Sequence, residues 1–110
     1  MQYAPNQGDI VYLNFDPQAG HEQKGRGPCL IVSNSSFHKR TNLAMVCPIT
    51  NKSSNFPTHV PLDATTRTIG EIMCEQAKCL DIVARNAFFV ETVPNDILDE
   101  AIDLICSFVE

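Results

Sequence analysis

The sequence predicts an α+β domain that is dominated by a compact antiparallel β-barrel. Roughly five to seven short apolar segments alternate with turn-rich segments up to residue 90, which is typical of short antiparallel strands. One clear helical pattern follows in residues 94–108. The chain has 110 residues, the size of one domain, so we expect a single domain over residues 1–110.

The first part of the chain predicts two strands that enclose a long polar loop. The first strand covers Ile10 to Phe15 and ends before Asp16-Pro17. Residues 16–27 hold three glycines and one proline, so we expect a loop of about 12 residues. Loops of this length in a compact domain are often functional. The continuous apolar run from Cys29 to Val32 then predicts a central strand.

A short helix and a third strand are predicted next. Asn34 suits the N-cap of a helical turn that continues through Phe37 and His38. The apolar run from Leu43 to Ile49 predicts the third strand, and the polar residues 50–58 predict a second loop.

The remaining strands are short. We expect strands at His59 to Leu62 and at Ile69 to Cys74, separated by the turn-rich residues 63–67. Residues 80–84 predict a short helix or turn, and Ala87 to Val90 predict the last strand.

The C-terminal segment predicts an amphipathic helix that packs over the barrel. Pro94 suits a first helical position, and Asp96 is favourable near the helix N-terminus. Apolar residues recur at helical spacing and form one stripe. The stripe consists of Ile97, Ala101, Leu104, Ile105 and Phe108. The acidic side chains Asp99, Glu100 and Asp103 fall mostly on the opposite, solvated face.

Composition indicates an ordinary globular protein and excludes several classes. The chain is 44% hydrophobic and 19% charged, and no apolar run approaches the roughly 20 residues that cross a bilayer. The first residues lack the pattern of a signal peptide, so we expect a cytoplasmic protein without a membrane partner. The five cysteines form no C-x-x-C pair, and we expect reduced core residues rather than disulfides or a zinc site.

Charge is distributed unevenly along the chain. The net charge is −5, yet residues 91–110 contain six acidic and no basic residues, so the rest of the chain carries +1. Residues 20–40 contain four basic residues and one acidic residue, which gives +3. A locally basic segment on an acidic body fits a small single-strand site and not a long duplex footprint.

An ordered set of motifs spans nearly the whole chain. Together these motifs resemble the MazF/PemK family of toxin endoribonucleases from bacterial toxin–antitoxin pairs. The motifs are GDIVYLNFDP, GHEQKG, GPCLIVSN, CPIT with Asn55-Phe56 after it, and Gly70-Glu71-Ile72 running into Glu75-Gln76 and Leu80-Asp81.

The resemblance implies an SH3-like barrel of the PemK/CcdB-like toxin fold that forms a homodimer. It also implies a toxin of a type II toxin–antitoxin system that cuts single-stranded RNA, chiefly mRNA, at a short sequence. A cognate antitoxin would neutralise it. Toxins related in fold act on DNA gyrase instead, which is a further alternative.

The resemblance assigns cleavage to a loop arginine and to the threonine that matches Thr50. Thr50 ends the third predicted strand, where its hydroxyl either serves a phosphate or simply bonds nearby backbone. Arg26 presents a fork of donors to a phosphate, and the alternative is a solvated loop cation. His21 suits acid–base work because an imidazole titrates near neutral pH. Relatives of the PemK type give a matching histidine a role in substrate contact or proton transfer, whereas other relatives lack it, and the alternative is an exposed loop histidine.

One departure from the family pattern affects the expected activity. The family usually has arginine directly before the proline of the loop, where this chain has Gly27, with Arg26 one residue earlier. Pro28 restricts residue 27 to extended backbone, and Arg26 then points the opposite way. The alternative function is therefore a catalytically impaired module that still binds antitoxin or RNA.

Further candidates for substrate contact lie in the long loop and after the strand that contains Ile72. These candidates are Glu22, Gln23, Lys24, Glu75 and Gln76. Glu75 matches an aspartate that some relatives use, but those relatives also carry an arginine where this chain has Met73. His38 and His59 are interpreted as structural or exposed.

We expect neither a metal nor a cofactor. Phosphate-binding and zinc-protease motifs are absent from the sequence, and its carboxylates are scattered or crowded into the C-terminal helix. The sequence favours attack by the 2′-hydroxyl of the RNA itself, which leaves a 2′,3′-cyclic phosphate and a 5′-hydroxyl and excludes DNA.

Overall fold

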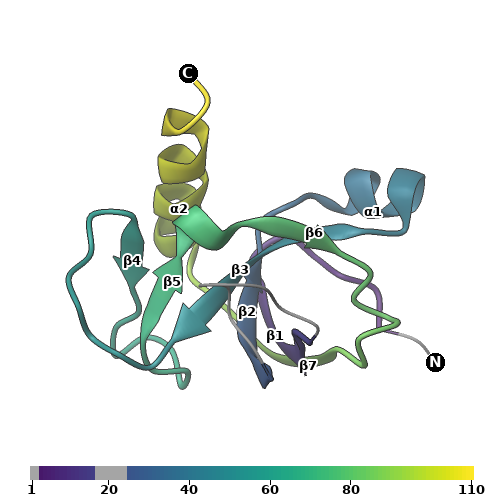
Figure 1. Ribbon diagram of the computed structural model, residues 1–110, viewed down its shortest axis with the longest axis horizontal. Coiled ribbons are helices and arrows are strands. Elements are labelled where there is room, and N and C mark those ends of the chain that lie inside the picture. Colours follow the sequence, from purple (N-terminus) through teal and green to yellow (C-terminus); the bar gives the residue numbers. More distant parts are fainter. Residues whose placement is uncertain (1–2, 17–24) are drawn as a thin grey trace.

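The computed structural model describes residues 3–16 and 25–110 (Figure 1). It contains seven strands, two α-helices and one short 3₁₀ helix. In chain order they are β1 (Asp9–Asn14), β2 (Arg26–Ile31), α1 (Ser35–Thr41), β3 (Ala44–Thr50), β4 (His59–Pro61), β5 (Glu71–Met73), η1 (Cys74–Gln76), β6 (Lys78–Leu80), β7 (Phe88–Thr92) and α2 (Asn95–Ser107).

All seven strands join one antiparallel sheet, so the predicted α+β class is confirmed. The strand order is β4-β5-β3-β2-β1-β7, and β6 pairs separately with β3. β3 is central because one of its edges meets β2 while the other edge meets β6 near Ala44 and β5 near Thr50. The described pairing is an open path that ends at β4 and β7, so it does not include the expected closure of a barrel.

Alternating side chains along the strands build two apolar clusters, one on each face of the sheet. Ile10, Leu30 and Cys47 belong to the cluster that α2 covers. Val11 and Cys29, each one residue away, belong to the other cluster. Since burying one such side chain contributes about 1.5–3 kcal/mol, this alternation fixes the strand register.

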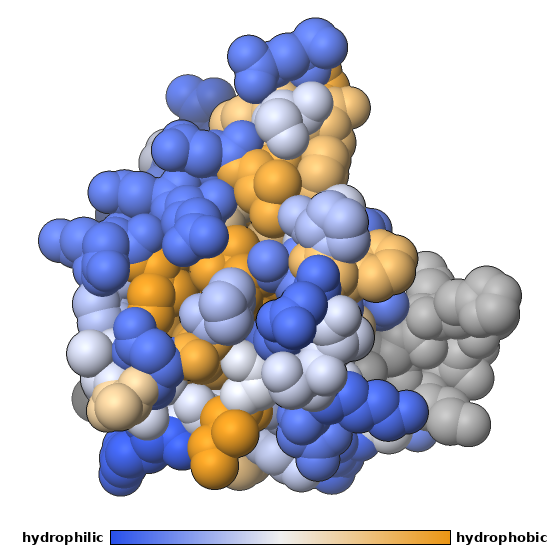
Figure 2. All heavy atoms as spheres, turned by 90° about the vertical axis from the view of Figure 1, so that its left-hand side faces the viewer, coloured by the Kyte–Doolittle hydropathy of each residue, from blue (hydrophilic) through white to orange (hydrophobic). Residues whose placement is uncertain are grey.

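Helix α2 follows the predicted apolar stripe for most of its length. Ile97 and Ala101 are buried, and Leu104 and Ile105 pack partly buried against the same cluster. Phe108 lies past the last turn and is 44% exposed. Figure 2 shows hydrophilic side chains on one flank of this helix and hydrophobic ones on the other. Across residues 3–16 and 25–110, no helix is both long and apolar enough to span a bilayer.

Several local expectations were wrong or incomplete. Arg26 and Gly27 were predicted to lie in the long loop. They are instead the first residues of β2, because their backbones pair with β1. Residues 78–80 form the edge strand β6, and the predicted turn follows at 82–86. Asn34 caps α1 as expected, and its Oδ1 accepts from the Phe37 amide at 2.9 Å.

The five cysteines are all free thiols, as expected. Cys29, Cys47 and Cys74 are buried, which agrees with the predicted core role. Cys79 and Cys106 are exposed, so the core prediction was wrong for these two. Cys79 lies on the edge strand β6, and Cys106 follows Ile105 on the last turn of α2, outside the predicted stripe.

Candidate functional site

The end of β3 carries the candidate site, because Thr50 lies between two hollows and lines both. One hollow, of about 260 Å³, includes Arg26 and Gly27. The other, of about 270 Å³, includes His59, Glu75 and Gln76. The Thr50 Oγ1 accepts from the Lys52 amide at 3.3 Å, which agrees with the backbone-bonding role that sequence left open. That oxygen retains a proton that it can donate to a ligand.

Arg26 lies on the aromatic side of the first hollow. Its guanidinium carbon is 5.6 Å from the centroid of the Tyr12 ring and 6.0 Å from that of Phe88. Within the described part of the chain, Arg26 has no ion-pair partner. The structure therefore brings Arg26 and Thr50 to one hollow, where the guanidinium presents a fork of donors suited to an anion.

Strand register places Arg26 and Gly27 on opposite faces of β2. Pro28 lies opposite Tyr12, so the alternating side chain of Arg26 shares the face of Tyr12. Cys29 of β2 pairs with Pro48 of β3. Two residues further along this antiparallel pair of strands, Gly27 lies opposite Thr50. Residue 27 thus belongs to the Thr50 face, and glycine at this position supplies no side chain to that face.

Gly70 fixes the start of β5 against the end of β3. Its φ is +134°, and a Cβ atom there would lie 2.0 Å from the Thr50 carbonyl oxygen. Only glycine allows this approach of two backbones. The approach also sets Ile69, which is 81% exposed, at the wall of the first hollow.

A hydrogen-bonded histidine and two glutamates border the second hollow. His59 Nδ1 lies 2.8 Å from Glu71 Oε1, and His59 Nε2 lies 3.1 Å from Glu75 Oε2. The Thr58 hydroxyl donates to the other oxygen of Glu75 at 2.8 Å. Because ionised carboxylates only accept, this geometry favours the doubly protonated imidazolium.

The electrostatics of this cluster agree with that protonation. Burial lowers the pKa of His59, but the hydrogen bonds and charges of Glu71 and Glu75 outweigh burial and raise it. The hydrogen bond from His59 is the main cause that lowers the pKa of Glu71. Glu71 also accepts from the amides of Ser54 and Asn55, so the cluster anchors the loop after β3.

The sequence analysis interpreted His59 as structural or exposed, but it did not predict the contacts with Glu71 and Glu75. Its side chain is only 9% exposed and bridges two carboxylates. The missed signal is the β4–β5 pairing, which sets His59 opposite Met73, two residues before Glu75. Glu75 and Gln76, candidates for substrate contact, lie in η1 and line the same hollow as Thr50.

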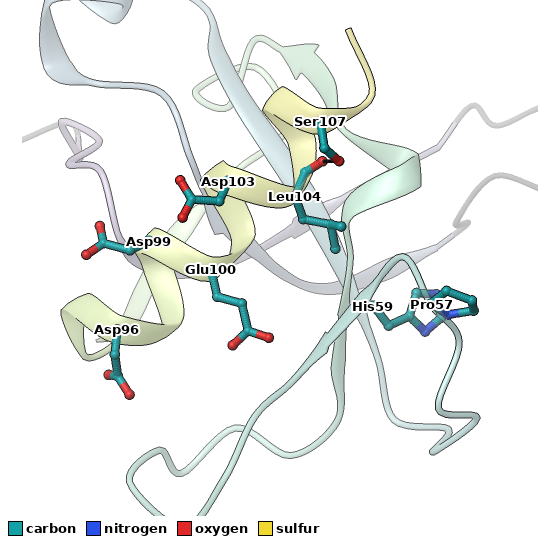
Figure 3. A pocket seen from close by; sticks show the side chains of 8 residues that line it. All are labelled: Pro57, His59, Asp96, Asp99, Glu100, Asp103, Leu104 and Ser107. Carbon is teal, nitrogen blue, oxygen red and sulfur yellow. Dashed lines mark hydrogen bonds between the residues drawn. The ribbon is translucent and has the colours of Figure 1, made fainter. Parts of the chain in front are cut away.

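A larger open hollow, of about 660 Å³, lies between α2 and the segment that contains His59. Figure 3 shows Glu100 and Leu104 projecting from α2 toward the side of His59. Four carboxylates line it, from Asp96, Asp99, Glu100 and Asp103. This hollow repels phosphate, so a polyanion fits the end of β3 better.

Four predicted site residues lie outside the described residues. They are His21, Glu22, Gln23 and Lys24. Of the remaining candidates, the structure gathers Arg26, Thr50, Glu75 and Gln76 around the end of β3, although not in a single hollow.

The chain matches a family model described as PemK-like, MazF-like toxin of type II toxin-antitoxin system over residues 6–109. Endoribonuclease PemK of Escherichia coli is 37% identical over 101 residues, covering 86% of this chain and 74% of that protein. Endoribonuclease toxin ChpB of Escherichia coli (strain K12) is 33% identical over 109 residues, covering 94% of this chain and 92% of that protein.

Solved structures show the same likeness. The crystal structure of MazF (Form-I) from Deinococcus radiodurans superimposes with a TM-score of 0.91 at 36% identity and covers 97% of both chains. A chain of the MazE-MazF (Form-II) crystal structure from the same organism has a TM-score of 0.85 at 36% identity, covering 97% of this chain and 96% of that chain.

Proposed function

Because the chain belongs to the PemK-like, MazF-like family of toxins of type II toxin–antitoxin systems, we propose that it is an endoribonuclease. Its substrate is single-stranded RNA, chiefly mRNA, which it cuts at a short sequence. The observation that carries the proposal is the position of Thr50, between a hollow that contains the Arg26 guanidinium and a hollow lined by His59, Glu75 and Gln76. Such a position offers donors to a phosphate and polar groups to the flanking nucleotides.

The proposed reaction uses only groups of the RNA and side chains of this chain. The RNA 2′-oxygen attacks the adjacent phosphorus and loses its proton, while the bond to the 5′-oxygen breaks and that oxygen gains a proton. The products are a 2′,3′-cyclic phosphate and a 5′-hydroxyl. Thr50 donates to a phosphate oxygen, Arg26 offsets the charge that develops there, and His21 transfers a proton. Glu22, Gln23, Lys24, Glu75 and Gln76 contact the flanking RNA.

The same proposal includes partners. The chain forms a homodimer in the cytoplasm, its sheet curls into the SH3-like barrel of the family, and an antitoxin neutralises it. Support comes from MazE-MazF crystal structures of Deinococcus radiodurans, to which this chain is similar. Limited core in a chain of 110 residues also favours symmetric pairing.

The test is cleavage of a mixed-sequence RNA by purified protein in excess EDTA, beside the same sequence as DNA. We expect RNA products with cyclic phosphate ends and intact DNA. RNA cutting that stops in EDTA, or DNA cut at the same rate, would contradict the proposed chemistry.

A second candidate function is an impaired module that binds RNA or antitoxin and cuts poorly. It is favoured by the register, which leaves Gly27 on the Thr50 face while Arg26 shares the face of Tyr12. Gly27 has no positive φ, so an arginine fits its backbone. Under this candidate, Gly27→Arg raises the cleavage rate roughly 10²–10³-fold, since one positioned donor is worth that much.

The matched control for Gly27→Arg is Arg26→Ala. Strong cutting by the unaltered chain that Arg26→Ala abolishes would assign the role to Arg26 and exclude the impaired module.

A further inference from the structure

Tyr12 and Arg26 line the first hollow and, together with Phe88 beside it, form a platform of aromatic rings and a guanidinium on three adjacent strands. Tyr12 of β1 lies directly opposite Phe88 of β7, with ring centroids 5.6 Å apart and planes 32° apart. Arg26 of β2 stands over both rings, 5.6 Å from Tyr12 and 6.0 Å from Phe88. Three side chains that meet in this way offer one continuous surface to a flat, electron-rich ligand.

The platform is open to solvent. Phe88 is 52% exposed on β7, at one end of the described sheet, and Arg26 is exposed on β2. Exposed aromatic rings beside a cation that has no described ion pair are what proteins use to stack single-stranded bases.

The other residues that line the hollow are mostly apolar. Pro28 lies beside Tyr12 on the neighbouring strand, and Ile49 and Ile69 complete the apolar lining. The hollow measures about 260 Å³, below the roughly 300–1,000 Å³ of sites for drug-sized ligands. It therefore suits one planar ring system that contacts both the apolar residues and the platform.

We propose that this hollow is a nucleobase subsite, in which one unpaired RNA base stacks on Tyr12 and Arg26. Asn51, which also lines the hollow, presents an amide that both donates and accepts at the edge of the base. Phe88 extends the platform toward the next base. The subsite rests on the proposed function, because it sets the neighbouring phosphate beside Thr50. It also makes Tyr12, Arg26 and Asn51 determinants of the cut sequence.

The experiment measures binding of a fluorescent, mixed-sequence DNA of about ten nucleotides, a length that suits a single-strand site. DNA lacks the attacking 2′-hydroxyl, so binding is separated from cleavage. Phe88→Leu and Tyr12→Leu keep apolar bulk and remove the ring. We expect each to weaken binding about 5- to 150-fold, the range found for one stacked base.

Phe89→Leu is the matched control. Phe89 is the neighbour of Phe88 on β7 and is equally exposed, at 50%, but its ring faces Tyr3 at 6.3 Å and not the platform. We expect Phe89→Leu to change affinity less than twofold. The proposal would be overturned if Phe89→Leu weakened DNA binding as much as Phe88→Leu does. Exposed apolar side chains on β7 in general would then explain both losses of affinity.

Two further readouts test stacking itself. The chain has no tryptophan, so Phe88→Trp introduces a single fluorophore, and a stacked base should quench it. An abasic oligonucleotide keeps every phosphate, and Phe88→Leu should leave its affinity unchanged. Equal weakening for abasic and ordinary DNA, absent quenching, or a shift of Phe88→Leu to another oligomeric state would each overturn the subsite. RNA cleavage is scored separately, so failure of the subsite and failure of the proposed nuclease are distinguishable.

Discussion

Gly70→Ala tests the backbone contact on which the candidate site is built. The added Cβ would lie 2.0 Å from the Thr50 carbonyl oxygen, 2.9 Å from the Thr50 carbonyl carbon and 3.2 Å from the Asn51 Cα. All three are backbone atoms, so no rotation of a side chain relieves the contact. The variant folds only if β5 and the end of β3 move apart.

The expected loss of stability has two parts. Alanine at a φ of +134° costs about 1–3 kcal/mol in backbone strain. Moving the segment weakens the hydrogen bond from the Leu62 amide to the Gly70 carbonyl, at 2.9 Å, and the ladder between β3 and β5, at about 0.5–1.5 kcal/mol per bond. The sum is about 3 kcal/mol or more, which lowers Tm by roughly 10–15 °C in a chain of this size.

Gly25→Ala is the matched control. Gly25 also has a positive φ, +73°, but an added Cβ there meets no atom of the described residues within 4 Å. This variant carries only the backbone term, about 1 kcal/mol, so its Tm falls by about 3–5 °C. The difference between the two variants isolates the contact with Thr50.

The assay is thermal unfolding followed by circular dichroism, together with RNA cleavage at a temperature where both variants are folded. Gly70→Ala should lose cleavage activity because Thr50 and Ile69 shift. Gly25→Ala should retain activity because the Thr50 hydroxyl stays in place. If the two variants unfold within about 2 °C of each other, the backbones are not in contact and this account of the site fails.

Three further predictions follow from the same geometry. The pKa of His59 is raised and that of Glu71 is lowered in the folded protein. The contribution of Glu71 to stability is therefore full above about pH 4.5, and that of His59 is full below about pH 6.5. The contribution of the pair falls as pH rises through the folded pKa of His59. His59→Gln should therefore remove part of the fall in Tm between pH 6 and pH 8. Equal slopes in both proteins would show that the ion pair is not formed. Besides Glu71 and Glu75, the charged groups that face His59 are Asp96, Asp99, Glu100 and Asp103, which line the hollow on the α2 side. Thr50→Val keeps the shape and removes the hydroxyl, so cleavage should fall roughly 10²–10³-fold. Tm should fall by only a few degrees, since the hydrogen bond from the Lys52 amide is lost, and retained activity would reduce Thr50 to a strand end. Sedimentation at low micromolar concentration should give about twice the chain mass of 12.2 kDa, and a clean monomer would remove the homodimer from the proposal.

The sequence predicted those parts of the fold that local pattern determines. The apolar alternation in residues 10–15, the N-cap at Asn34 and the stripe from Ile97 to Ile105 each have a period or a capping chemistry that a short window reveals. The strand β6 has no such pattern. It consists of Lys78, Cys79 and Leu80, which form a strand only because they pair with a free edge of β3. This pairing is a tertiary contact that a short sequence window does not reveal.

The candidate site was predicted unevenly for the same reason. Thr50 is evident as a hydroxyl that ends an apolar strand. His59 depends on partners 12 and 16 residues away, so only the pairing of β4 with β5 reveals its role. The platform of Tyr12, Arg26 and Phe88 joins three strands that are far apart in sequence, and no local window contains it.

Position along a strand, and not charge, decides what an arginine does at this site. Exchanging the residues at 26 and 27 would leave the composition and the net charge of −5 unchanged. It would nevertheless move a guanidinium from the face of Tyr12 to the face of Thr50, because neighbouring strand residues point to opposite sides. In the proposed subsite the cation on the first face stacks a base, whereas a guanidinium on the second face would lie beside the phosphate that is cut. A gain of cleavage in Gly27→Arg with unchanged binding of DNA would assign phosphate contact to position 27 and base stacking to Arg26. That result would favour the impaired module over the nuclease in which Arg26 offsets the phosphate charge.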